Sequence, residues 1–68
     1  MEEVKIDEIY IHINTGRVYE ILACENFKLT FDGVWYDAVL YRGVGEGESE
    51  LWSRIKEDFM NKFEKYIG

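Results

Sequence analysis

The chain has 68 residues, a net charge of −6, one cysteine, one histidine and no proline. This length allows one domain with a thin hydrophobic core, and a single cysteine excludes a disulfide within the chain. No segment is long and apolar enough to span a membrane, and the acidic N-terminus is unlike a signal peptide. We therefore expect one domain over residues 1–68 in a cytoplasmic protein that has no membrane partner.

The negative charge lies in the first 53 residues. Residues 1–26 carry six acidic and two basic side chains (net −4), residues 27–53 carry five and two (net −3), and residues 54–68 carry three and four (net +1). A protein that binds nucleic acid needs a basic face to neutralise phosphates. The charge distribution therefore argues against direct binding to nucleic acid.

Two hairpins are predicted in the first part of the chain. Ile9–Ile13 alternates between isoleucines and polar or aromatic residues, and Asn14-Thr15-Gly16 is typical of a turn that leads into a second strand over Arg17–Cys24. Asp32-Gly33 is a tight-turn signal between strands at Phe27–Phe31 and Val34–Arg42. Both faces of Val34–Arg42 are largely apolar, so we expect this strand inside a barrel or beneath another element.

The pattern changes after a glycine-rich loop. Gly43–Glu50 alternates glycine with glutamate and is predicted to be a mobile loop, followed by a short strand at Leu51–Ser53. Apolar residues then recur every four positions, at Ile55, Phe59, Phe63 and Ile67. This period predicts a C-terminal helix over about 55–67, with Ser53 near its start as the cap. Short strands with tight turns plus one helix predict an α+β, mainly β fold: a small antiparallel β-barrel with a C-terminal α-helix.

Several positions resemble the pattern of a small bacterial family of unknown function that has an SH3-like β-barrel. The matching residues are Tyr10-x-His12, Gly16-x-x-Tyr19, Val39-x-Tyr41-Arg42, Leu51-Trp52-x-Arg54 and Phe59. Departures from the pattern are Cys24-Glu25-Asn26 in place of a polar segment, about six extra residues between Ala23 and Tyr41, and Ile55 in place of a proline. The resemblance implies an SH3-like barrel and a bacterial or phage origin, and it implies no activity.

No catalytic or metal site can be assembled from the sequence. His12 has no recognisable nucleophile or orienting partner, and Cys24 has no neighbouring base to lower its pKa. One cysteine and one histidine are too few for a tetrahedral zinc site. The alternating Glu46, Glu48 and Glu50 lack the order of an EF-hand loop. We therefore expect no catalytic residue, no metal and no cofactor.

Aromatic residues with arginine are typical of binding hot spots. The candidate partner-binding residues are Tyr10, His12, Tyr41, Trp52 and Arg54. The alternative is that the rings form the core and that Arg54 pairs with a carboxylate such as Asp37.

The sequence favours a non-catalytic binding or regulatory module with a protein partner. One alternative is an acidic decoy that docks on a nucleic-acid-binding protein, and a second is a small enzyme that uses His12. An unpaired edge strand or the apolar surface near Met60 would also allow a homodimer.

Overall fold

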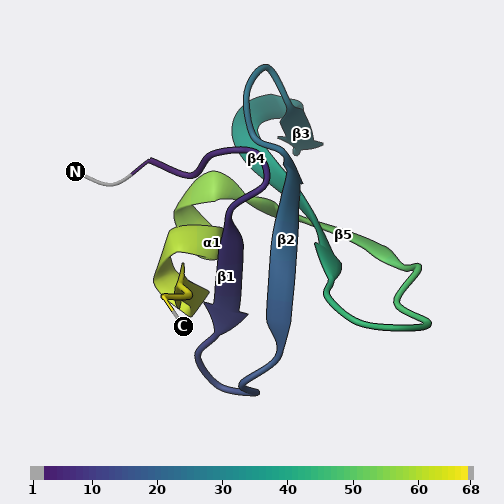
Figure 1. The fold of residues 1–68 in the computed structure, drawn as a ribbon. Coiled ribbons are helices and arrows are strands. Elements are labelled where there is room, and N and C mark those ends of the chain that lie inside the picture. Colours follow the sequence, from purple (N-terminus) through teal and green to yellow (C-terminus); the bar gives the residue numbers. More distant parts are fainter. Residues whose placement is uncertain (1–2, 68) are drawn as a thin grey trace.

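A computed structural model describes residues 3–67 of the chain (Figure 1). It contains six strands and one short helix within that range. They are β1 (Ile9–His12), β2 (Val18–Ala23), β3 (Lys28–Phe31), β4 (Val34–Gly43), β5 (Leu51–Ile55), α1 (Lys56–Lys62) and β6 (Phe63–Lys65).

All strand pairings are antiparallel, and the long strand β4 connects them. β2 and β3 pair with successive parts of β4, and the β2–β4 pairing has a register shift between Ile21 and Ala23. β5 also pairs with β4, over Ala38 to Arg42. β1 pairs with β2 on one side and with β6 on the other. β3, β5 and β6 therefore have one strand partner each within residues 3–67.

Both predicted hairpins are confirmed, and their turns have the backbone conformation that the sequence requires. Asp32 and Gly33 have φ angles of 51° and 78°, so both central residues of the β3–β4 turn are in the left-handed region. Gly16 in the β1–β2 turn has a φ of 74°. Gly16 and Gly33 have no Cβ, so they avoid the steric cost that a side chain brings at such angles.

The core is a cluster of rings between the sheet and α1. Phe59 on the helix is fully buried and stacks on Phe63, with ring centroids 4.2 Å apart. Tyr10 meets Phe59 edge-on at 5.2 Å, and Tyr41 lies 5.2 Å from Phe63 and 5.3 Å from Phe59. Ile21, Ala38 and Val39 are also fully buried. The arrangement explains how a thin core is filled without a disulfide, since each ring buries a large apolar area.

The predicted helix over 55–67 is too long. α1 ends at Lys62, and Phe63, with φ −126° and ψ 153°, begins β6. Backbone hydrogen bonds from Ile13 N to Lys62 O (3.0 Å) and from Tyr66 N to Ile9 O (2.9 Å) fix this segment along β1. The pairing satisfies the open edge of β1, which a longer helix would leave unpaired. The predicted cap is also wrong, because Ile55 occupies the N-cap position and makes no side-chain cap hydrogen bond.

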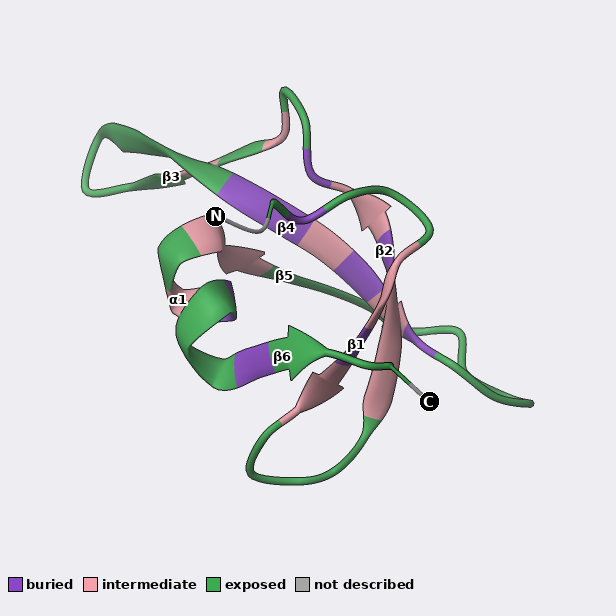
Figure 2. Cartoon of the chain, turned by 60° about the vertical axis from the view of Figure 1, so that its left-hand side comes forward, coloured by how far each residue is buried: buried purple, intermediate pink, exposed green. Residues whose placement is uncertain are grey.

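The expectation that β4 is buried along its whole length holds for the second part of the strand and is wrong for the first part. Ala38 and Val39 are fully buried and Tyr41 nearly so, whereas the first part of the strand, Val34–Asp37, is exposed. Figure 2 shows this hairpin of β3 and β4 as an exposed arm that projects from the sheet. Five of the eleven aromatic side chains are exposed, three of them on this hairpin: Phe31, Trp35, Tyr36, Trp52 and Tyr66.

The structure confirms a mainly β fold with one short C-terminal helix. The sheet is not closed, since β5 and β6 have no strand pairing with each other within residues 3–67. In this part of the chain, no helix has the length and apolar character needed to cross a bilayer.

Candidate functional site

An apolar groove runs along β5. It has a volume of about 350 Å³ and is lined by Leu29, Phe31, Tyr41, Trp52, Ser53, Arg54, Ile55 and Asp58. Four of these residues, Trp52–Ile55, are consecutive. The remaining lining residues come from β3, β4 and the first turn of α1, so the hollow lies across these elements.

The exposed walls of the groove are aromatic. Trp52 is 49% exposed and Phe31 is 63% exposed. Phe31 and Leu29 come from β3, which contacts β5 although it pairs only with β4. A half-exposed tryptophan in a hollow can bury its remaining area against a ligand, which is how binding hot spots gain their energy.

Arg54 is held rigidly at one end of the groove. Its Nε donates to the Tyr41 hydroxyl at 2.9 Å, and its Nη1 donates to the Asp58 carboxylate at 2.7 Å. Its guanidinium also lies 5.6 Å from the centre of the Phe63 ring. The expected pairing of Arg54 with Asp37 is wrong, because Asp37 pairs with Lys28 at 2.6 Å.

These contacts change the ionisation of the group. The hydrogen bond from Arg54 lowers the pKa of Asp58, with Lys62 assisting, and the bond to Asp58 raises the pKa of Arg54. Burial raises the pKa of the Tyr41 hydroxyl although Arg54 opposes the change. Near neutral pH the end of the groove therefore holds a neutral phenol and a matched ion pair, with no group poised to exchange a proton.

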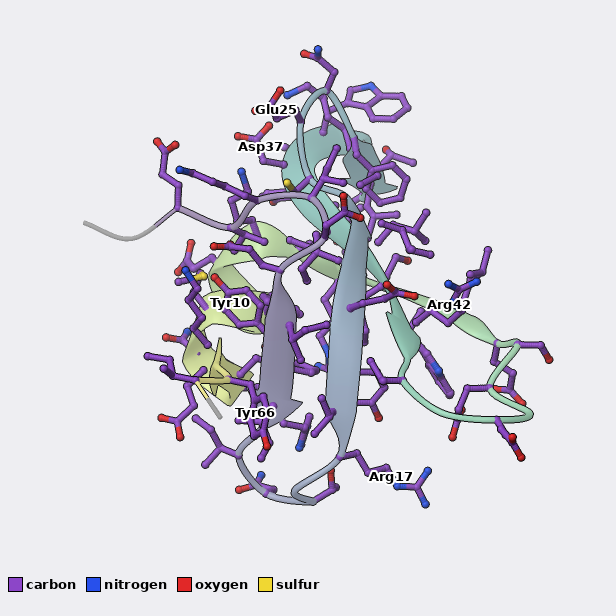
Figure 3. The ribbon with its side chains drawn as sticks, viewed as in Figure 1. Tyr10, Arg17, Glu25, Asp37, Arg42 and Tyr66 are labelled. Atoms are coloured by element: carbon purple, nitrogen blue, oxygen red, sulfur yellow. The ribbon has the colours of Figure 1, made fainter. Side chains whose placement is uncertain are left out.

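A second, more polar hollow of about 510 Å³ shares Trp52 with the groove. Its lining includes Arg17 at the end of the β1–β2 turn and Glu48 and Glu50 from the loop before β5. Figure 3 shows Arg17 beside the connection between β1 and β2, at the bottom of the view. Trp52 thus stands between an apolar hollow and one that carries two carboxylates against one guanidinium.

Of the predicted site residues, the structure brings together Tyr41, Trp52 and Arg54, and it places Tyr10 and His12 elsewhere. Tyr10 is 1% exposed and lies between β1 and α1 (Figure 3). His12 meets Phe63 edge-on at 4.8 Å, and its Nδ1 accepts a hydrogen bond from Thr15 N at 3.3 Å. Both residues therefore serve packing and the β1–β2 turn, and neither lines the groove.

The remaining chemical candidates are Cys24 and the three glutamates of the loop before β5. Cys24 is buried, its thiol donates to the Val4 carbonyl at 3.2 Å, and burial raises the pKa of that thiol. Glu46, Glu48 and Glu50 are exposed. Residues 3–67 contain no group of three or more histidine, cysteine or acidic side chains placed to hold a metal ion.

Sequence reasoning missed three residues of the groove: Leu29, Phe31 and Asp58. Asp58 lies four residues after Arg54, a spacing that pairs opposite charges on a helix. Leu29 and Phe31 alternate on β3, which marks a shared face, but only the curl of the β3–β4 hairpin brings that face to β5.

Comparison of the chain with protein-family models, with curated proteins and with solved structures finds no match.

Proposed function

We propose that this protein is a non-catalytic module that binds a partner protein through the groove along β5. The observation that carries the proposal is Trp52, a half-exposed ring between two hollows, beside an arginine already fixed by Tyr41 and Asp58. A rigid aromatic anchor with a preorganised polar neighbour loses little conformational entropy on binding.

The fold proposed for this module is an SH3-like barrel left open between β5 and β6. The order of the strands supports it: β1, β2, β4 and β5 are antiparallel neighbours in that order, β3 pairs with the first part of β4, and β6 returns after α1 to pair with β1. An experimental structure in which β6 pairs with a strand other than β1 would contradict this assignment.

Selection of binders from a random peptide display library tests the function. The bait is the immobilised chain, and each enriched clone is retested on Trp52→Ala and on Trp35→Ala. Trp35 is the matched control, since it is an exposed tryptophan that does not line the groove. We expect clones that lose about tenfold or more in affinity on Trp52→Ala and little on Trp35→Ala.

Two results would argue against the proposal. One is a set of clones that bind Trp52→Ala and Trp52→Phe as well as the original chain. The other is dependence on His12, which lies outside the groove, so His12→Ala serves as a second control. Circular dichroism of each variant verifies that the loss of binding is not a loss of the fold.

A further inference from the structure

The open edge of β5 is the starting point. Val44 N donates to Val18 O and Ala38 N donates to Phe27 O, so the even-numbered residues of β4 direct their backbone groups toward β2 and β3. The odd-numbered residues then face β5, where Tyr41 is opposite Trp52 and Val39 is opposite Arg54.

This alternation decides which groups of β5 are unpaired. Trp52 and Arg54 turn their backbone groups toward β4, and Leu51 and Ser53 turn theirs away from it. No other strand lies opposite Leu51 and Ser53 in the part of the chain that the structure describes. Both residues are exposed, and Ser53 also lines the groove. Unpaired strand edges of this kind accept an added strand.

The charged residues near this edge indicate which kind of chain would pair with it as an added strand. Ion pairs hold five of the eight basic residues of the protein: Lys28, Arg42, Arg54, Lys62 and Lys65. Glu46, Glu48 and Glu50, which precede β5 directly, form no ion pair with another described residue. A second copy would bring its own charge of −6 and its own three glutamates to this edge, and like charges repel. A basic partner is attracted instead.

We propose that β5 takes an extended segment of a partner protein as an additional strand, and that this segment combines an apolar side chain with lysine or arginine. The apolar side chain packs in the groove against Trp52 and Phe31. The basic side chain lies across Trp52, in the hollow of Glu48 and Glu50. Backbone groups of the segment pair with Leu51 and Ser53. This inference rests on the proposed function and names the class of partner.

Three synthetic pools of ten-residue peptides test the inference. They share the same apolar residues at alternate positions, and the remaining positions are Lys/Arg, Ser/Asn or Asp/Glu. Trp52 fluorescence in a Trp35→Phe background reports binding, because this variant has one tryptophan. We expect the basic pool to bind about tenfold or more tightly than the neutral pool, and the difference to shrink as salt rises. Slowed amide exchange at Leu51 and Ser53 on binding is the expected mark of strand addition.

Matched variants separate the three parts of the site. Glu48→Gln/Glu50→Gln should lower affinity for the basic pool and leave the neutral pool unchanged, whereas Glu25→Gln/Glu64→Gln removes the same charge from other exposed positions and should have a smaller effect. Ser53→Pro removes an amide on the open edge and should weaken every pool. The amide spectrum of Ser53→Pro verifies that β5 still pairs with β4 in this variant.

The outcomes distinguish this inference from the proposed function. Equal binding of the basic and neutral pools overturns the basic partner, and binding without slowed exchange at Leu51 and Ser53 overturns strand addition. The proposed function survives both results if Trp52→Ala, measured by the fluorescence anisotropy of a dye-labelled peptide, still abolishes binding. If no pool binds in a way that depends on Trp52, both the further inference and the proposed function are overturned. An oligomer of the free chain that Ser53→Pro dissociates would assign the edge to a second copy.

Discussion

Single aromatic residues divide between two tasks in this protein. Tyr10, Phe59 and Phe63 are buried at 3% exposure or less, whereas both tryptophans are about half exposed or more. Tryptophan is the largest apolar side chain and would contribute most to a core this thin. Leaving both tryptophans on the surface therefore costs the fold stabilisation that it has little room to lose, which is consistent with a use for Trp52 outside the core.

Phe59 is the residue on which the core depends most. We expect Phe59→Ala to cost about 3–5 kcal/mol, because it removes the ring that contacts Tyr10, Tyr41 and Phe63. A domain of this size has a total stability of only roughly 3–10 kcal/mol. Urea unfolding followed by circular dichroism should show a largely unfolded variant. The control is Phe31→Ala at an exposed position, which should change stability by less than about 1 kcal/mol.

The ionisation of Asp58 gives a pH dependence. Arg54 lowers the pKa of Asp58 in the folded state, so the folded protein favours the carboxylate more than the unfolded chain does. The resulting stabilisation is present above the unfolded pKa of about 4 and is lost as the pH falls through the lower, folded pKa. Glu8, paired with Lys65 at 2.7 Å, behaves in the same way.

The urea concentration at the midpoint of unfolding should therefore decrease as the pH is lowered from 5 to 2, a range that includes the unfolded pKa of about 4. Asp58→Asn should lower stability at pH 7 by less than about 1 kcal/mol, since the side chain is 43% exposed and screened by solvent. The effect of the same substitution should become smaller towards pH 2, because the Asp58 carboxylate is lost as the pH falls through its folded-state pKa. An equal effect at both pH values would show that Asp58 acts through packing and not through charge.

At the scale of elements, local sequence was sufficient for the hairpins and insufficient for the C-terminus. Asp32-Gly33 predicts a turn whatever surrounds it, since the required φ angles are a local property. Phe63 satisfies two patterns at once, because a buried ring there suits a helix stripe and a strand equally. Only the open edge of β1, 51 residues earlier at His12, decides in favour of β6.

The turn between β3 and β4 offers a test of this local argument. Gly33 has a φ of 78° and no atom within 4 Å of an added Cβ, so a substitution meets backbone strain and no collision. We expect Gly33→Ala to cost about 1–2 kcal/mol, measured by urea unfolding. Asp32→Asn should be neutral, since asparagine tolerates a left-handed φ. Equal stability of Gly33→Ala and the original chain would show that the hairpin does not require this turn.

At the scale of the whole molecule, the groove was not predictable from sequence. Its walls come from β3, β4, β5 and α1, and Leu29 is 29 residues away from Asp58. Residue type predicts Tyr41, Trp52 and Arg54, which line the groove, and equally Tyr10 and His12, which do not, because residue type carries no information on position in the fold. The curl of the β3–β4 arm over β5 depends on the balance of many packing contacts, which no short motif encodes.

The chain carries a net charge of −6, to which the glutamates before β5 contribute. Glu48 and Glu50 form no ion pair within the described residues, so no close opposite charge offsets their repulsion by the other acidic side chains. Glu20 differs, since it pairs with Arg42 across β2 and β4. We expect Glu48→Gln/Glu50→Gln to leave stability unchanged or raise it by up to about 0.5 kcal/mol at low salt, and Glu20→Gln to lower it by a similar amount.

Thermal unfolding at about 0.01 M and 0.5 M salt checks both signs, because salt screens repulsion and attraction between exposed charges alike. The two variants should therefore converge on the original chain at high salt. A loss of stability in Glu48→Gln/Glu50→Gln at low salt would show that these glutamates hold the loop before β5 in place. Their carboxylates would then be occupied within the fold, and they would no longer be free to attract a basic partner to the open edge.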